Sequence, residues 1–202
     1  MFDQHERAHL YTLAGSQSSL PERECQLLRP AVHAMLEALM PLPACVVNAR
    51  LDILAYNATY GRLVADLDTM AFEDRNSLWL MFTQPAWRAA VVDWDDAVPR
   101  LVAQYRAGMA AHVGEPVWKC LLKRLQDASP EFREMWDRHE VETPENRTKQ
   151  VLNPHVGMLN LDFTHLYFGP RIGTRLTTYT PADEQTAARL RELAELTVRA
   201  AA

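Results

Sequence analysis

The stretch from residue 147 to residue 180 constrains the fold most, because there the hydrophobic period changes from about 3.6 residues to about two. Between residues 158 and 168 every second side chain is apolar or aromatic: Leu159, Leu161, Phe163, His165 and Tyr167. This alternation predicts a strand with one buried face. Residues 147–152 and 174–180 are predicted as strands beside it, and the Gly-Pro-Arg-Ile-Gly stretch at 169–173 as an antiparallel turn. This part of the chain is therefore predicted to form a three-stranded meander.

Two more strands are predicted earlier in the chain. Residues 44–48 and 52–56 are short apolar runs rich in strand-forming residues, and their spacing predicts a β-hairpin. Asn57 follows directly and is a suitable N-cap for a helix that runs to about Asp66. The very apolar segment 76–83 is predicted as a short buried helix.

Helices are predicted between the hairpin and the meander. A helical stripe of apolar residues runs from Pro85 to about Ala111, and Pro99 inside it predicts a kink or a restart near Asp93. Further helices are predicted over about 116–127 and from Ser129-Pro130. No βαβαβ alternation appears, which disfavours a Rossmann-type fold. We predict an α+β fold, PAS-like in its chain order, with one five-stranded antiparallel sheet and helices packed across one face.

Helices are also predicted at both ends of the chain. Residues 3–14 are predicted as a short helix and residues 15–19 as a linker. Ser19 and Glu22 form a capping box that opens a helix with one apolar stripe: Leu28, Val32, Met35 and Leu39. The last helix is predicted to start at Thr180-Pro181. The sheet is thus expected to have flanking N- and C-terminal helices.

Charge and cysteine content restrict the function classes. The 202 residues include 21 Lys and Arg against 26 Asp and Glu, a net charge of −5, which argues against nucleic-acid wrapping by this chain alone. The three cysteines form no CxxC, and unpaired thiols fit a reducing compartment. The first residues lack a signal peptide's apolar region, and no uncharged stretch approaches a membrane span. We expect a cytoplasmic protein with no membrane contact.

Five strings in a fixed order resemble one known family. They are PACVVN with DILAYN (43–48, 52–57), NSLWLMF (76–82), DWD with YRA (93–95, 105–107), SPEF with Trp136 and HEV (129–132, 139–141), and VGMLNLD (156–162). Together they resemble the MmyB-like transcription-regulator ligand-binding domain, a PAS-related module of bacterial regulators. The resemblance covers roughly residues 20–195.

The resemblance carries expectations about organisation and function. Members usually have an XRE-type helix-turn-helix domain before this module, so residues 1–18 look like the remnant or linker helix after it and residues 19–202 like the PAS-like domain. The implied function is sensing of an apolar small molecule, with a fatty acid suspected. DNA would be bound only through the helix-turn-helix domain, which this chain lacks, and we expect a homodimer. One departure is visible, because the family's His-Pro-x-x-Gly reads Asn153-Pro154-His155-Val156-Gly157 here.

Candidate ligand-binding residues follow from the predicted elements. Helices that cover the sheet would supply Trp79, Phe82, Trp94 and Trp136, and the strand at 158–168 would supply a floor of Leu159, Leu161 and Phe163. Arg106 offers a planar fork for a ligand carboxylate, and His139 is a further polar candidate. The alternative for every aromatic is ordinary core packing. For Arg106 the alternative is a surface ion pair or a stem covering apolar surface, and His165 would be a satisfied core histidine.

Other chemistry is disfavoured by the motifs. The seven histidines show no HxxxH, HxH or HExxH spacing, and no phosphate-binding glycine loop occurs, so we expect no metal and no cofactor. The acids of Asp93-Trp94-Asp95-Asp96 suit a helix start better than acid–base catalysis. We therefore expect a sensing domain rather than an enzyme. The alternatives are a dimerisation domain without a ligand and, ranked last, an unrecognised enzyme on the same scaffold.

Overall fold

A single five-stranded antiparallel sheet organises the computed structural model, which describes residues 28–138, 148–168 and 173–201. The strand order is β2-β1-β5-β4-β3. The strands are β1 (Ala44–Val47), β2 (Ile53–Tyr56), β3 (Lys149–Asn153), β4 (Gly157–Tyr167) and β5 (Arg175–Pro181). The predicted hairpin and meander are confirmed, and with them the α+β class. The PAS relation stays a prediction, and the turn at 169–172 lies outside the described residues.

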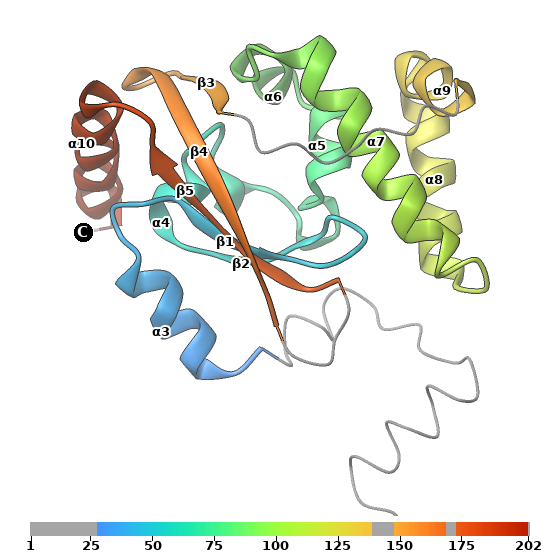
Figure 1. Cartoon of the computed structure of the whole chain (residues 1–202), viewed down its shortest axis with the longest axis horizontal. Coiled ribbons are helices and arrows are strands. Elements are labelled where there is room, and N and C mark those ends of the chain that lie inside the picture. The colour runs from blue at the N-terminus through green and yellow to red at the C-terminus, as the bar shows by residue number, and fades with distance from the viewer. Residues whose placement is uncertain (1–27, 139–147, 169–172, 202) are drawn as a thin grey trace, which may run out of the picture.

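Helices lie on both faces of this sheet (Figure 1). They are α3 (Pro30–Ala38), α4 (Ala58–Gly61), α5 (Ser77–Thr83), α6 (Pro85–Ala90), α7 (Trp94–Ala110), α8 (Pro116–Ala128), α9 (Pro130–Asp137) and α10 (Glu184–Ala201), with short 3-10 turns at Leu67–Thr69 and Phe72–Asp74. Leu36 of α3 packs with Val46 and Leu176 on one face. The helices after β2 and α10 pack on the other, which is called the helix-facing side below. The N-terminal helix therefore flanks the sheet, as expected.

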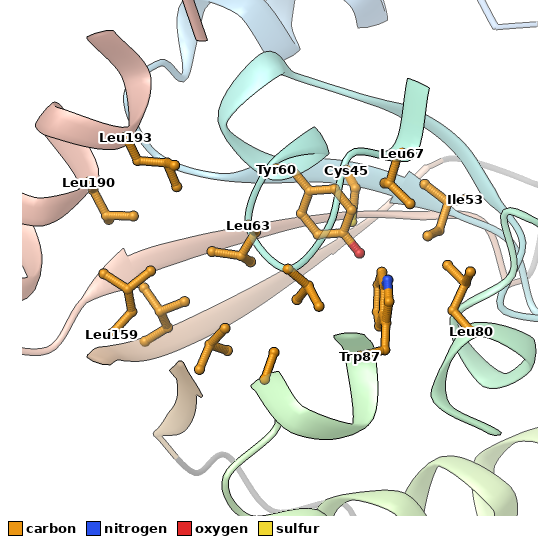
Figure 2. Close-up of a cluster of buried hydrophobic side chains, with 14 of the residues drawn as sticks. Cys45, Ile53, Tyr60, Leu63, Leu67, Leu80, Trp87, Leu159, Leu190 and Leu193 are labelled. Carbon is orange, nitrogen blue, oxygen red and sulfur yellow. The ribbon is translucent and has the colours of Figure 1, made fainter. Parts of the chain in front are cut away.

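The main core lies between the helix-facing side and its helices, and is called the sheet cluster. Its strand residues include Cys45, Val47, Ile53, Val151, Leu159 and Leu161. Figure 2 shows Tyr60 of α4, Trp87 of α6 and Leu190 of α10 reaching this layer from three directions. At about 25 cal/mol per Å² of apolar surface, this burial is the main force that holds the helices to the sheet.

A second core, called the helical cluster, joins α5, α7, α8 and α9. Its buried members are Leu51, Leu78, Trp94, Val98, Val102, Tyr105, Trp118, Leu121, Leu125 and Phe132. In Figure 1 α7, α8 and α9 stand together at one end of the molecule, away from α3 and α10. The predicted restart near Asp93 is confirmed, because α6 ends at Ala90 and α7 begins at Trp94 and runs through Pro99.

Three helix boundaries differ from the predictions. α3 begins at Pro30 rather than just after Ser19, because Arg29 precedes a proline and is extended, while the capping box at Ser19 and the helix at 3–14 lie outside the described residues. Asn57 caps α4 by accepting from Tyr60 N, but α4 ends at Gly61 rather than near Asp66. The carbonyls of Arg62 and Leu63 accept from the Asn153 amide at 3.0 and 2.9 Å, so they are committed to the β3–β4 turn instead of a longer helix. The last helix begins at Glu184 rather than Thr180-Pro181, because β5 pairing with β4 extends to Pro181.

Candidate functional site

Three basic side chains share the helix-facing side of the sheet: Lys149 on β3, His165 on β4 and Arg175 on β5. They are called the basic row. The register pairs Lys149 with Leu161, His165 with Thr177 and Tyr167 with Arg175. Since residues two apart on a strand share a face, all three lie on the same face as the buried Leu161. Phe163 and Tyr179 pair between them and place aromatic rings inside the row.

Lys149 lies over this aromatic pair. Its Nζ is 4.5 Å from the ring centre of Phe163 and 5.5 Å from that of Tyr179, which is within cation–π range. The side chain is exposed by surface area, yet burial among surrounding protein atoms lowers the pKa of its ammonium. Arg175 lowers the same pKa further by charge repulsion.

His165 sits between the other two members of the basic row. Its Nδ1 is 2.9 Å from the Thr177 hydroxyl, and its ring centre is 5.0 Å from that of Phe163. Burial lowers the pKa of His165 to about 4, with further lowering by the charges of Arg175 and Lys149. The imidazole is therefore neutral near pH 7, and it has the hydrogen-bonded partner expected of a core histidine.

Arg175 is buried, with only 6% of its surface exposed. The Gln104 side-chain oxygen on α7, with its amide oriented for this contact, accepts from the two terminal nitrogens at 3.0 and 2.8 Å. The Nε atom is buried and has no hydrogen-bond partner. No carboxylate among the described residues forms an ion pair with Arg175. Buried guanidinium groups normally have an acidic partner, so this one is unusual.

Three ionisable groups beside the basic row, all on described residues, are held neutral. Burial raises the pKa of the Cys45 thiol to about 12 and raises the pKa values of Tyr60 and Tyr179 well above their usual range. All three therefore stay neutral at physiological pH. A further unpaired donor, the Trp87 indole nitrogen, lies in the same sheet cluster. Figure 2 shows Trp87 and Tyr60 pointing into the layer between α6 and α4.

The predicted ligand-binding residues fall into two groups. Leu159 and Leu161 lie in the sheet cluster, and Phe163 lies beside Lys149. The others belong to the helical cluster or pack on it: Trp79, Phe82, Trp94, Trp136 and, through Trp136, Arg106. His139 lies outside the described residues. The structure therefore brings together the strand residues with one another and the helix residues with one another.

Arginines stack on the three tryptophans of the predicted set. Arg124 lies 4.2 Å from the ring of Trp79, Arg88 4.2 Å from that of Trp94, and Arg106 4.6 Å from that of Trp136. Arg106 also donates to the Trp136 carbonyl. Phe82 packs edge-on against Trp94 at 5.9 Å. These contacts are what core packing and a covering arginine stem produce, while a role in ligand contact stays a prediction.

One family of known proteins matches most of the chain. Residues 28–193 match the family described as the MmyB-like transcription regulator ligand binding domain. The chain belongs to this family. No curated protein matches the chain. The MmyB-like domain is thus a ligand-binding module of a transcription regulator, as the sequence resemblance indicated.

Two further findings concern the described part of this MmyB-like domain. No helix in it is long and apolar enough to cross a bilayer. Its described residues hold no group of three or more histidine, cysteine, aspartate and glutamate side chains placed to bind one metal ion.

The departure from His-Pro-x-x-Gly has a structural explanation in this MmyB-like domain. Asn153 is 2% exposed, and besides its two donor bonds to α4's end it accepts from His155 N and Val156 N through Oδ1 at 2.9 and 3.1 Å. All four bonds of one amide therefore hold the β3–β4 turn. His155 itself is exposed. Asn153 therefore serves the turn, and His155 lies on the surface beside it.

Lys149 and Arg175 were not among the predicted site residues. The alternation of Lys149 with Val151, and of Arg175 with Thr177 and Tyr179, was visible in the sequence. This alternation places each cation on the same strand face as apolar or aromatic side chains, and it is the sequence signal that could have identified the two residues. What the sequence could not show is that these cations lie on one face of the sheet, on either side of β4, and that no described carboxylate pairs with them.

Proposed function

We propose that this MmyB-like domain is a cytoplasmic sensor that binds an apolar small molecule, with a fatty acid as the favoured class, against the helix-facing side of the sheet. The observation that carries the proposal is the change in packing along β4. Leu159 and Leu161 are fully buried, whereas Phe163 and its partner Tyr179 remain partly exposed on the same face. Partly covered aromatic surface beside a sealed core is the kind of surface that an apolar ligand covers.

Ligand occupancy acts on DNA binding through a difference in affinity between two conformations. The break between α6 and α7, at residues 91–93, is the candidate moving part, because α6 packs on the sheet cluster and α7 on the helical cluster. The N-terminal side of α3 is the route by which occupancy would reach the DNA-binding part of the regulator. Non-enzymatic sensing by population shift needs no catalytic residue.

Mass spectrometry of the purified protein, native and then after solvent extraction, tests the proposal. We expect a co-purified lipid at stoichiometric amount, or a thermal stabilisation by fatty acids from octanoate to stearate. At a hundredfold excess over Kd, binding adds about 2.7 kcal/mol, which raises Tm by about 5–10 °C in a domain of this size. A protein free of lipid that no member of the panel stabilises would contradict the proposal.

Dimerisation of the regulator without a ligand is the second candidate function. Leu152 and Leu166, 47% and 53% exposed, lie on the opposite face of the sheet, on β3 and β4, beyond the strands that α3 covers. Light scattering on the purified chain separates the two functions. A dimer that Leu166→Lys converts to a monomer, with no lipid bound, would favour this candidate over the sensor.

A further inference from the structure

Arg175 is buried, yet no carboxylate among the described residues supplies it with a counter-charge. With 6% exposure, its guanidinium has lost most of its hydration, and its described contacts are the neutral amide of Gln104 and nothing at Nε. Removing a charge from water without a partner costs several kcal/mol. A group in this situation is stable in the fold only when packing elsewhere compensates or when an anion binds to it.

The rest of the basic row increases the positive potential at Arg175. Lys149 reaches over Phe163 and Tyr179, and His165 lies between the two cations, so three basic groups share one face of three adjacent strands. The groups nearest to them are neutral thiol and phenol side chains. Burial lowers the pKa values of Lys149 and His165, and repulsion within the row lowers both further. An anion placed at the row would relieve this repulsion.

The surroundings of the row are apolar and aromatic. Phe163 and Tyr179 lie inside it, and Leu161 and Cys45 continue into the sheet cluster. A small inorganic anion would use the charges but leave this surface uncovered. An amphiphile uses both, because its head group pairs with the cations while its body covers the aromatic pair.

We infer that the basic row, with Arg175 and Lys149 as its charged members, binds the anionic head group of the ligand, and that a carboxylate on an apolar body is the preferred chemistry. This inference rests on the proposed function, in which the domain binds the apolar body of the ligand. It adds which residues recognise the anionic head group. Arg175 offers its Nε, which has no described partner while both terminal nitrogens donate to Gln104, and Lys149 supplies a point charge at the solvent side. Discrimination between charged and neutral ligands thus resides on the sheet, away from Arg106.

The experiment compares ligands with one chain length and different heads on the full chain. Dodecanoate, dodecanol, dodecyl phosphate and inorganic phosphate are titrated by calorimetry at one salt concentration. We expect dodecanoate to bind about 10- to 100-fold more tightly than dodecanol, as charge-assisted hydrogen bonds provide. Tighter binding of dodecyl phosphate would assign a phosphate head instead, and inorganic phosphate reports whether the head binds without a body.

Substitutions in the basic row test whether its side chains cause the preference for dodecanoate over dodecanol. Arg175→Gln and Lys149→Gln are each expected to reduce the dodecanoate-to-dodecanol ratio about tenfold, and Arg175→Lys to recover part of it. Lys123→Gln, on exposed surface of α8, is the matched control and leaves the ratio unchanged. If Arg175→Gln does not fold, the exposed Lys149 and the conservative Arg175→Lys still test the row. A purely structural role for Arg175 would lower Tm and leave the ratio at the wild-type value.

The outcomes separate this inference from the proposed function. Equal affinity for dodecanoate and dodecanol would overturn the anionic head group and leave the apolar sensor standing. Binding of inorganic phosphate that Arg175→Gln abolishes, without binding of any dodecyl compound, would support the anion site and contradict the apolar ligand. No binding of any of the four compounds would overturn both.

Discussion

The helical cluster and the helix-facing side of the sheet differ in whether their basic side chains have carboxylate partners. Around the helical cluster, Arg88 of the neighbouring α6 pairs with Glu131 at 2.7 Å and Arg124 of α8 pairs with Asp74 at 2.6 Å, and each also stacks on a tryptophan. On the sheet, Arg175 and Lys149 have aromatic or amide neighbours and no ion pair among the described residues. Since both regions are built from similar apolar residues, the difference lies in charge compensation. The compensated charges of the first region serve packing, and we propose that the uncompensated ones of the second serve a ligand.

The largest expected effect concerns the helical cluster alone. Phe132 has 0% exposure and its ring lies 5.2 Å from Phe82 and 5.8 Å from Trp136. Phe132→Ala should lower the free energy of unfolding by about 3–5 kcal/mol through lost burial and a cavity. Urea denaturation measures this, and the ligand preference of the folded fraction should not change. A loss below about 1 kcal/mol would show that the cluster is loosely packed and is itself open to ligands.

The next effect contrasts a compensated buried arginine with an uncompensated one. Arg50 forms a buried ion pair with Asp52 at 2.8 Å, and Asp52 also accepts from Asn48 and Asn76. Arg50→Met should cost about 3 kcal/mol, because it leaves a buried carboxylate with fewer partners. Arg175→Met in ligand-free protein should be neutral or stabilising by about 1 kcal/mol, since it removes an unpaired charge. Equal destabilisation by the two variants would contradict the comparison.

A smaller effect is expected from the pH dependence of stability. His165 has its pKa lowered to about 4, against an ordinary value of 6.5, because of burial and of the facing charges of Arg175 on β5 and Lys149 on β3. The unfolded chain therefore binds this proton more readily than the folded chain, and stability falls as pH drops from about 6.5 to about 4. Partial exposure reduces the expected loss to about 1–2 kcal/mol. Denaturant curves across this range should show the slope, and His165→Gln should remove that part of it.

Much of the fold could be predicted because local patterns and tertiary structure agree. Alternation located β4, Ser129 does accept from Phe132 N as a cap, and the break before Trp94 follows the predicted restart. The end of α4 could not be predicted, because it depends on Asn153, about ninety residues later in the chain. Contacts at that separation leave no periodic signal.

The candidate site was predicted only in part, for a physical reason. Large aromatics such as Trp79 and Trp136 attract attention in a sequence, yet arginines of the same chain stack on them here. Arg175 looks ordinary at the start of a strand, and its significance lies in the lack of a nearby carboxylate. The missing acidic partner depends on which residues are neighbours in three dimensions. Sequence patterns therefore draw attention to large aromatic residues rather than to a buried arginine without an acidic partner.

The smallest expected effect sharpens the comparison most directly, because it separates stability from binding at one residue. Lys149 is exposed and has no ion pair among the described residues, and its described contacts are with the rings of Phe163 and Tyr179. Lys149→Gln should therefore change the free energy of unfolding by no more than about 0.5 kcal/mol, as exposed substitutions usually do. Thermal unfolding without ligand measures this term, and Lys123→Gln supplies the reference for a plain surface lysine. A loss well above 1 kcal/mol would mean that the ammonium holds the sheet face together, and the basic row would then resemble the self-compensated charges of the helical cluster.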